Sequence, residues 1–215
     1  MLDKVVLVHG YNRDKYDLLV LRDNLIELGY DALVVNLPLT YKKIEYGTAV
    51  FKEKMQQIIA DTEPNEKVHI VGHSFGGIVV RLYLAQTEYE TKIGRAVLIG
   101  TPNRGSKLAG YAVLFSYTFI KIFKALVAID PQQFQKLDLE AADRFEIGAI
   151  AGDKMNLLLG GLLDEVNDGR IEVSSVYYEG LKDFIVIHYG HNEIHYKFET
   201  ARLVDSFLRT GEFKE

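Results

Sequence analysis

The sequence predicts an α/β protein whose central sheet is mostly parallel and is covered by helices on both faces. Two observations lead to this class. Short apolar runs alternate along the chain with longer segments in which apolar residues recur every three or four positions, a spacing typical of amphipathic helices. Most of the short runs are continuously apolar, as expected for parallel strands that are buried on both sides. With 215 residues, the chain is expected to form one domain.

Six strands and four helical segments account for most of the chain. The expected strands cover residues 4–8, 32–35, 68–71, 96–99, 147–150 and 184–187. The expected helices cover residues 14–28, residues 51–59, the apolar stretch after Ser74, and residues 198–208. The stretch after Ser74 is apolar on nearly every face, so we expect that helix to be deeply buried.

The composition excludes several kinds of function. A net charge of −5 argues against nucleic acid as a partner. The chain contains no cysteine, which rules out a disulfide framework, a thiol nucleophile and a cysteine-ligated metal. The first residues resemble a strand rather than a signal peptide, so we expect a cytoplasmic protein, although a trimmed secreted form would look the same.

The most informative stretch runs from residue 68 to residue 80. In it, Gly72, Ser74 and Gly76 form a G-x-S-x-G pattern between an apolar strand and an apolar helix. This arrangement is typical of a nucleophile elbow, in which a serine sits on a sharp strand-to-helix turn with its hydroxyl exposed. Glycines are needed there because the backbones approach so closely that a Cβ would clash. The helix start also directs N–H groups toward the serine, which suits a developing oxyanion.

Other polar positions follow strands in the same way. His9-Gly10 comes directly after the first strand, and Thr101-Pro102 comes after the fourth. Ligands of parallel sheets bind at the carboxyl ends of the strands. We therefore expect these positions and Ser74 to gather at one edge of the sheet and to form one site.

Five short motifs occur in order from residue 7 to residue 208. They are Leu7-Val8-His9-Gly10, Gly72-His73-Ser74-Phe75-Gly76-Gly77, Thr101-Pro102-Asn103-Arg104-Gly105-Ser106, Asn167-Asp168-Gly169, and Gly190-His191 before a C-terminal helix. With these motifs the chain resembles the α/β-hydrolases, and among them the small bacterial lipases and esterases. Residues 152–166 depart from the resemblance, because this segment is longer and richer in leucine than expected.

The resemblance implies a catalytic triad and an oxyanion hole. Ser74 would be the nucleophile, His191 the base and Asp168 the acid, in the chain order that this fold uses. The backbone N–H groups of Tyr11 and Phe75 would bind the oxyanion. No cofactor and no metal is implied.

The acid has a rival nearby in the sequence. Asp164 is an alternative, with Glu165 beside it. Asp168 is favoured because Asn-Asp-Gly is typical of a turn, after which residues 171–176 could lead back into the sheet.

The base also has a rival, since His195 lies four residues after His191. His191 is favoured because it follows Gly190 in a loop at the end of a strand, where catalytic side chains are commonly held. His195 instead stands at the start of the last helix. The remaining histidines are expected to be structural: His9, which would support the oxyanion loop, and His69, His73 and His188.

Residues 108–129 form an unusually apolar segment. Phe115, Phe119, Ile122, Leu126 and Ile129 recur at intervals of four and three, which predicts a helix. The uncharged run is too short to cross a bilayer. We expect a cap or lid insertion at about residues 105–137, which either packs permanently against the body or opens over an acyl pocket and touches a lipid surface. In both cases the pocket entrance should be apolar.

Together these features favour a serine hydrolase that cleaves carboxylic esters with an apolar acyl chain. A thioesterase, a lipid deacylase or an acyltransferase would use the same triad and remains open. A binding module on a hydrolase fold would have no need of the triad, so the complete Ser–Asp–His set argues against it. The expected partner is a small-molecule ester or lipid.

Overall fold

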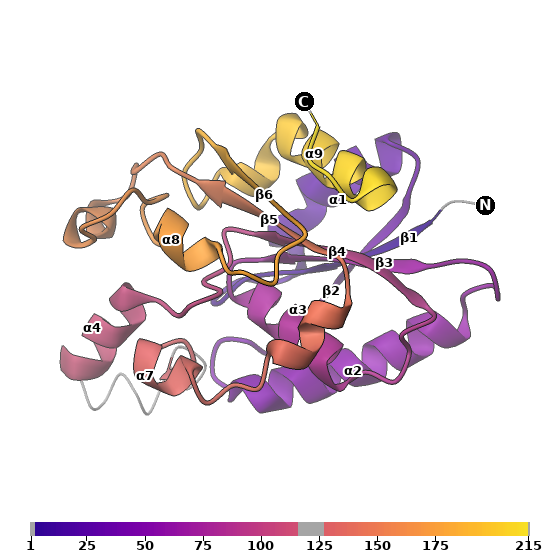
Figure 1. Ribbon diagram of the computed structural model, residues 1–215, viewed down its shortest axis with the longest axis horizontal. Helices are drawn as coiled ribbons and strands as arrows, with labels where there is room; N and C mark the ends of the chain where they lie inside the picture. The colour runs from indigo at the N-terminus through magenta and orange to yellow at the C-terminus, as the bar shows by residue number, and fades with distance from the viewer. Residues whose placement is uncertain (1–2, 116–126, 215) are drawn as a thin grey trace.

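A six-stranded sheet runs through the computed structural model, which describes residues 3–115 and 127–214 (Figure 1). The order across the sheet is β2-β1-β3-β4-β5-β6, and every neighbouring pair is parallel. The six predicted strands and the parallel sheet are thereby confirmed. The bounds are β1 Lys4–Val8, β2 Asp31–Val35, β3 Val68–His73, β4 Ile93–Ile99, β5 Ile147–Gly152 and β6 Asp183–Ile187.

Helices cover both faces of this sheet, as predicted (Figure 1). On one face lie α1 (Leu19–Glu27) and α9 (Phe198–Thr210). On the other face lie α2 (Ile44–Ala60) and α3 (Phe75–Gln86), and α3 is buried along most of its length. The result is a three-layer arrangement in which the strand ends carry the loops.

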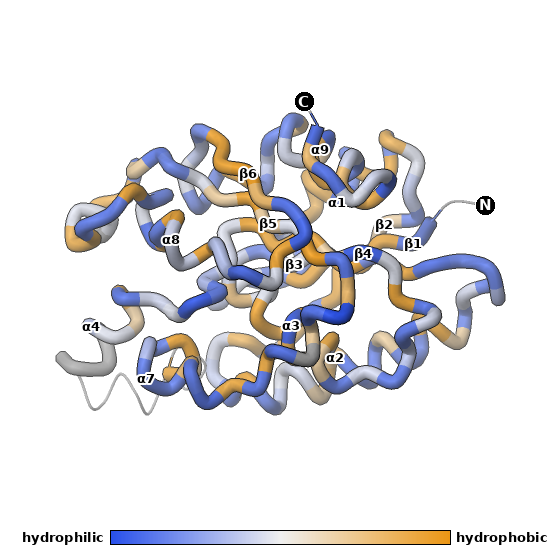
Figure 2. The backbone as a smooth tube through the Cα atoms, in the orientation of Figure 1, coloured by the Kyte–Doolittle hydropathy of each residue, from blue (hydrophilic) through white to orange (hydrophobic). Residues whose placement is uncertain are grey.

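Two hydrophobic cores form because successive strand residues point to opposite faces. In β1, Val5 and Leu7 belong to the core beneath α1 and α9, whereas Val6 and Val8 belong to the core beneath α2 and α3. All four side chains are fully buried. Figure 2 shows apolar residues concentrated along the central strands and polar residues on the outer turns.

The C-terminal helix follows its predicted pattern. Ala201, Val204, Phe207 and Leu208 lie on one face of α9 and are buried in the core that they share with α1. Gly211 ends the helix in a left-handed conformation, with φ of 80°, which a glycine adopts at little cost.

The first predicted helix is divided into two parts. Residues Lys15–Leu18 form a 3-10 turn, and α1 begins only at Leu19. The Asp14 side chain stabilises this 3-10 turn, because it accepts a hydrogen bond from the backbone N–H of Tyr16 at 2.9 Å. A capped tight turn therefore precedes the helix that the leucine spacing predicts.

Two other segments differ from the prediction. α2 begins at Ile44 rather than near residue 51, because Ile44 and Thr48 continue the buried stripe of Phe51 toward the N-terminus. Residues 171–176 do not return to the sheet as a strand. They contain the one-turn helix α8 (Val173–Val176), which is joined to the Asn-Asp-Gly turn by a bridge between Asn167 and Glu172.

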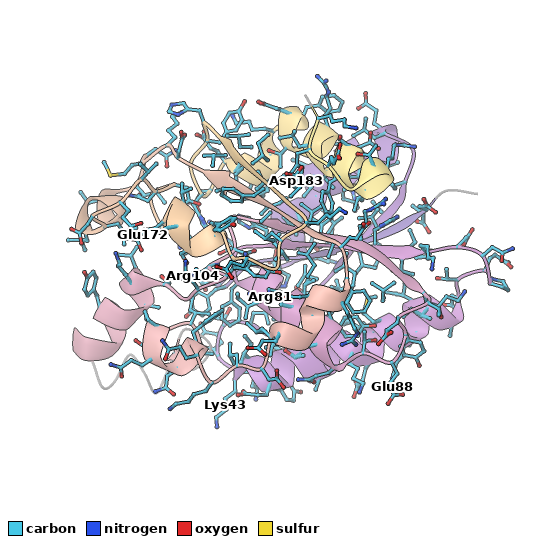
Figure 3. All side chains as sticks on the ribbon, viewed as in Figure 1. Lys43, Arg81, Glu88, Arg104, Glu172 and Asp183 are labelled. Carbon is cyan, nitrogen blue, oxygen red and sulfur yellow. The ribbon has the colours of Figure 1, made fainter. Side chains whose placement is uncertain are left out.

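The apolar segment after β4 begins with α4 (Lys107–Phe115) and returns to the body through α7 (Pro131–Phe134) (Figure 1). Residues 116–126, including Phe119 and Ile122 of the predicted helix, lie outside the described residues. Lys107 at the start of α4 forms an ion pair with Glu172 at 2.7 Å, and Figure 3 shows Glu172 between α8 and α4. The assignment of a cap at residues 105–137 stays a prediction.

A helix that crosses a bilayer must be about 20 residues long and predominantly apolar. This requirement applies to each helix in the described part of the chain. None of them is both long enough and apolar enough to cross a bilayer.

Candidate active site

Ser74 occupies the sharp turn between β3 and α3. Its backbone has φ of 54° and ψ of −127°, a strained conformation for a residue with a side chain. The glycines around it permit this turn, because a Cβ on Gly72 would lie 2.5 Å from Gly77 Cα and one on Gly76 would overlap the carbonyl oxygens of Val8 and His9. The turn therefore presents the Ser74 hydroxyl at the carboxyl edge of the sheet.

The close contact at Gly76 yields a stability prediction. We expect Gly76→Ala to lower the free energy of unfolding by roughly 1–3 kcal/mol or more, because the new methyl group would force α3 away from β1. Gly161→Ala is the matched control, since a Cβ there meets no atom within 4 Å. Urea unfolding would measure both changes. Equal midpoints for the two variants would contradict the tight packing at the elbow.

Ser74, His191 and Asp168 lie in one chain of hydrogen-bond contacts. Ser74 Oγ is 2.9 Å from His191 Nε2, and His191 Nδ1 is 2.7 Å from Asp168 Oδ2. Asp168 is fully buried, and its other oxygen accepts the backbone N–H groups of Ile171 at 2.8 Å and Arg170 at 3.0 Å. With both oxygens engaged, the carboxylate is fixed so that Oδ2 faces the imidazole.

The backbone holds the same two loops together. The N–H of His191, in the loop after β6, donates to the carbonyl oxygen of Asp168 at 2.8 Å. Gly100, after β4, lies close against them with φ of 55°, and a Cβ there would be 3.4 Å from both Asp168 Oδ2 and His191 Nδ1. Loops that follow three different strands thus converge on one point beside Ser74.

The rival residues lie elsewhere. Asp164 is exposed. His195 is buried, with its Nε2 3.5 Å from Asp17 Oδ2, because the 3-10 turn Ile194–Tyr196 directs it into the body. The structure therefore brings Asp168 and His191, rather than these two residues, to Ser74.

His9 supports the loop after β1. The N–H of Leu37 donates to His9 Nε2 at 3.0 Å, so the proton of the neutral ring lies on Nδ1, which donates to Gly10 O at 2.9 Å. Burial lowers the pKa of His9, which favours this neutral form. The His9 side chain thus holds the loop and makes no hydrogen bond to Ser74.

Tyr11 and Phe75 lie close to Ser74. A Cβ on Gly10 would lie 3.1 Å from Ser74 Cβ, so the loop that carries Tyr11 passes directly beside the serine. Phe75 is the first residue of α3, a position whose N–H has no acceptor within the helix. The two rings meet edge to face with centroids 6.3 Å apart. The oxyanion-binding role of the two N–H groups stays a prediction.

Residues 5–170 match the family model described as the α/β-hydrolase fold. The chain belongs to the α/β-hydrolase family. The matched region contains Ser74 and Asp168, whereas His191 lies beyond it.

Several other proteins of known structure share the fold of this α/β-hydrolase. The lipase BlEst2 of Bacillus licheniformis, in its mature form, is similar with a TM-score of 0.82 and 19% identity, over 98% of this chain and 92% of that one. The metagenomic carboxyl esterase MGS0156 has a TM-score of 0.70 and 15% identity, over 89% and 65%. A soluble variant of the monoglyceride lipase of Saccharomyces cerevisiae has a TM-score of 0.67 and 11% identity, over 100% and 89%. No curated protein matches the chain by sequence.

A cavity of about 430 Å³ opens beside Ser74 of this α/β-hydrolase. Most of its wall is apolar, and two leucines come from the segment that departs from the sequence resemblance. Arg13, Arg170 and Asn192 also line it, together with five other polar residues, which are Tyr11, His73, Ser74, Ser106 and His191. The apolar lining residues are Phe75, Pro102, Leu108, Ala109, Ile129, Leu157, Leu158 and Ile171.

A buried polar cluster of Asp17, His73 and His195 lies behind the His191 loop. Within the described ranges these are the residues that could hold a metal ion, since their donor atoms all lie within 4.8 Å of one another. Burial, reinforced by His195 and His191, holds the pKa of His73 well below its usual value. His73 Nε2 is 3.3 Å from His191 O, and the His73 and His195 rings lie 4.1 Å apart.

Asp17 in this cluster already has cationic and hydrogen-bonding partners. Arg13 Nε is 3.6 Å from its Oδ1, and the Tyr196 hydroxyl donates to the same oxygen at 3.0 Å. Burial raises the pKa of Asp17, but His195, Tyr196 and Arg13 outweigh that effect and lower it. We therefore interpret the cluster as support for the His191 loop, because the charge of Arg13 opposes a second cation beside Asp17.

Proposed function

We propose that the protein is a serine hydrolase that cleaves carboxylic esters with an apolar acyl chain. The observation that carries the proposal is the contact chain from Ser74 Oγ to His191 Nε2 at 2.9 Å and from His191 Nδ1 to Asp168 Oδ2 at 2.7 Å. This is the geometry that activates a serine, because a neighbouring base must accept its proton and a carboxylate must orient that base.

The proposed reaction passes through an acyl-enzyme. Ser74 Oγ attacks the ester carbonyl carbon while His191 Nε2 takes the hydroxyl proton. The backbone N–H groups of Tyr11 and Phe75 stabilise the tetrahedral oxyanion. His191 then returns the proton to the departing alcohol oxygen, and a water molecule that His191 deprotonates releases the acid. Asp168 keeps the Nδ1 proton of His191 in place throughout, and the steps call for no cofactor.

The cavity supports an apolar acyl group. Leu108, Ala109 and Ile129 contribute to its wall from the segment after β4, and Leu157 and Leu158 from the segment after β5. Apolar surface of this kind binds alkyl chains by excluding water. Two of the similar structures are a lipase and a carboxyl esterase by name, which agrees with this choice. We also propose that residues 108–129 touch a lipid surface when the substrate is aggregated.

Hydrolysis of p-nitrophenyl esters from acetate to palmitate tests the proposal. We expect turnover with every member of the series that fits the cavity, and a higher kcat/KM for butanoate or longer chains than for acetate. Labelling by a fluorophosphonate without turnover of any ester would favour a thioesterase, deacylase or acyltransferase instead. Absence of both labelling and turnover would overturn the serine hydrolase.

Asp168 is expected to be the acid. Asp168→Asn should lower kcat by roughly 10⁴-fold while the protein stays folded, because an amide no longer enforces the productive tautomer of His191. Asp164→Asn is the matched control, since Asp164 is exposed and should change kcat little. A larger loss of kcat in Asp164→Asn than in Asp168→Asn would assign the role of the acid to Asp164. Steady-state kinetics on a p-nitrophenyl ester would decide.

A further inference from the structure

The cavity beside Ser74 has a cationic part as well as an apolar one. Arg13 comes from the loop after β1, Arg170 from the turn after Asp168, and Asn192 directly follows His191. The whole chain carries a net charge of −5, so two arginines in one cavity wall are a local feature and no part of a generally basic surface.

Arg13 is fixed next to the catalytic loop. Its Nη2 donates to Asn192 Oδ1 at 3.3 Å, and its Nε lies 3.6 Å from Asp17 Oδ1. The carboxylate in these contacts belongs to Asp17, which also contacts His195 and accepts a hydrogen bond from the Tyr196 hydroxyl. These contacts hold the Arg13 guanidinium at the cavity wall, with 42% of the side chain exposed.

Arg170 has no direct ion pair of this kind, although the charges of Asp168 and Asp17 act on it from a greater distance. Among the residues that the structure describes, no carboxylate oxygen lies within 4.0 Å of its guanidinium. Arg170 is exposed at the cavity wall. Partial desolvation and the charge of Arg13 lower its pKa, whereas the charges of Asp168 and Asp17 raise it, so both arginines and both carboxylates lie within electrostatic reach of one another. An anion bound near both guanidinium groups would be attracted to each of them and would offset their mutual repulsion.

The chemistry of the proposed reaction decides which part of the substrate meets these arginines. His191 must hand a proton to the departing oxygen, so the alcohol part of the ester lies on the His191 side of the cavity. Asn192 and Arg13 adjoin that side by sequence and by hydrogen bond. The N–H of Arg170 also donates to Asp168, the partner of His191. The leucine-rich wall is left for the acyl chain.

Resting on the proposed function, we propose that the alcohol part of the natural ester carries an anionic carboxylate or phosphate group, bound by Arg170 together with Arg13. Guanidinium groups suit this task, because their planar N–H pairs match both kinds of oxyanion. Arg170 is thereby a specificity-determining residue, whereas Ser74, His191 and Asp168 perform the chemistry.

A matched pair of substrates tests the proposal. The first compound is 4-(butanoyloxy)benzoate, and the second is its methyl ester, which has the same shape near the scissile bond but no charge. We expect a kcat/KM on the order of tenfold higher for the anion, as suits a charge-assisted hydrogen bond. The neutral compound has the better leaving group, so intrinsic reactivity opposes the expected preference. The preference should shrink at high salt.

Arg170→Gln should bring the anion-to-neutral ratio of kcat/KM close to the intrinsic ratio, mainly by raising KM for the anion. Arg170→Lys should restore part of the preference, because it keeps the charge but loses the paired N–H groups. Arg22→Gln is the control with the same change in net charge. Arg22 lies on α1, pairs with Asp23 and does not line the cavity, so its ratio should match the wild type.

A second pair, 1-butanoylglycerol 3-phosphate and 1-butanoylglycerol, separates the two oxyanions. A larger preference within this pair identifies phosphate, and a larger one within the benzoate pair identifies carboxylate. Equal turnover of charged and neutral members in both pairs, with ratios unchanged in Arg170→Gln, would overturn the proposal while leaving an ester hydrolase intact. Failure to hydrolyse any of the four compounds or any p-nitrophenyl ester would instead refute the proposed function.

Discussion

Replacing Ser74 with alanine is expected to reduce kcat for ester hydrolysis by on the order of a millionfold, the loss seen when a triad nucleophile is removed. The reason is geometric, since Ser74 Oγ lies 2.9 Å from the only acceptor that the proposed mechanism gives it, His191 Nε2. The same change should abolish covalent labelling by a fluorophosphonate probe, because the probe reacts only with an activated serine.

The control for this experiment is Ser174→Ala. Ser174 is exposed at the surface of α8, so its removal should leave labelling and turnover as in the wild type. Peptide mapping of the labelled protein should find the probe on Ser74. Unchanged turnover in a folded Ser74→Ala protein would end the serine hydrolase interpretation, whatever the probe reports.

The second large effect is expected at His191. His191→Ala should lower kcat by several orders of magnitude, up to about the loss at Ser74, because the nucleophile and the base act as one unit. Steady-state kinetics on one p-nitrophenyl ester would measure this loss.

His195→Ala distinguishes the base from its neighbour. His195 lies against the His73 ring and beside Asp17, so its loss should lower the melting temperature while kcat stays within roughly tenfold of the wild type. Circular dichroism would confirm that each variant is folded. A greater loss of kcat in His195→Ala than in His191→Ala would transfer the base to His195, in contradiction of the 2.9 Å contact at Ser74.

The sequence predicts the sheet well because buried parallel strands have a simple pattern. Val5 to Val8 are apolar on both faces and fully buried, so the run itself reveals the strand. Helix boundaries are harder, because they depend on side chains that only local geometry brings into use. Asp14 capping a 3-10 turn and Ile44 extending the buried stripe of α2 are two such cases.

The candidate site likewise contains some residues that the sequence reveals and others that it does not. Ser74 can be found from the sequence because a strained turn requires glycines on both sides. The choice of His191 over His195 depends on a short 3-10 turn that directs one ring inward, and residue spacing alone does not reveal that direction. The presence of Arg13, Arg170 and Leu158 in one cavity wall follows from how three loops fold over each other, which no local pattern encodes.

The segment that begins with α4 leaves the body of the protein next to the place where it returns to it. The N–H of Ser106 donates to the carbonyl oxygen of Ile129 at 2.7 Å, and a Cβ on Gly105 would lie 3.1 Å from Pro131 Cα. These contacts join the two ends of the segment. The number of residues between them can therefore change without altering the spacing between β4 and β5. We therefore expect that this segment can be exchanged, by selection or by engineering, without disturbing the sheet or the turn at Ser74, and that such an exchange would alter the acyl preference proposed above.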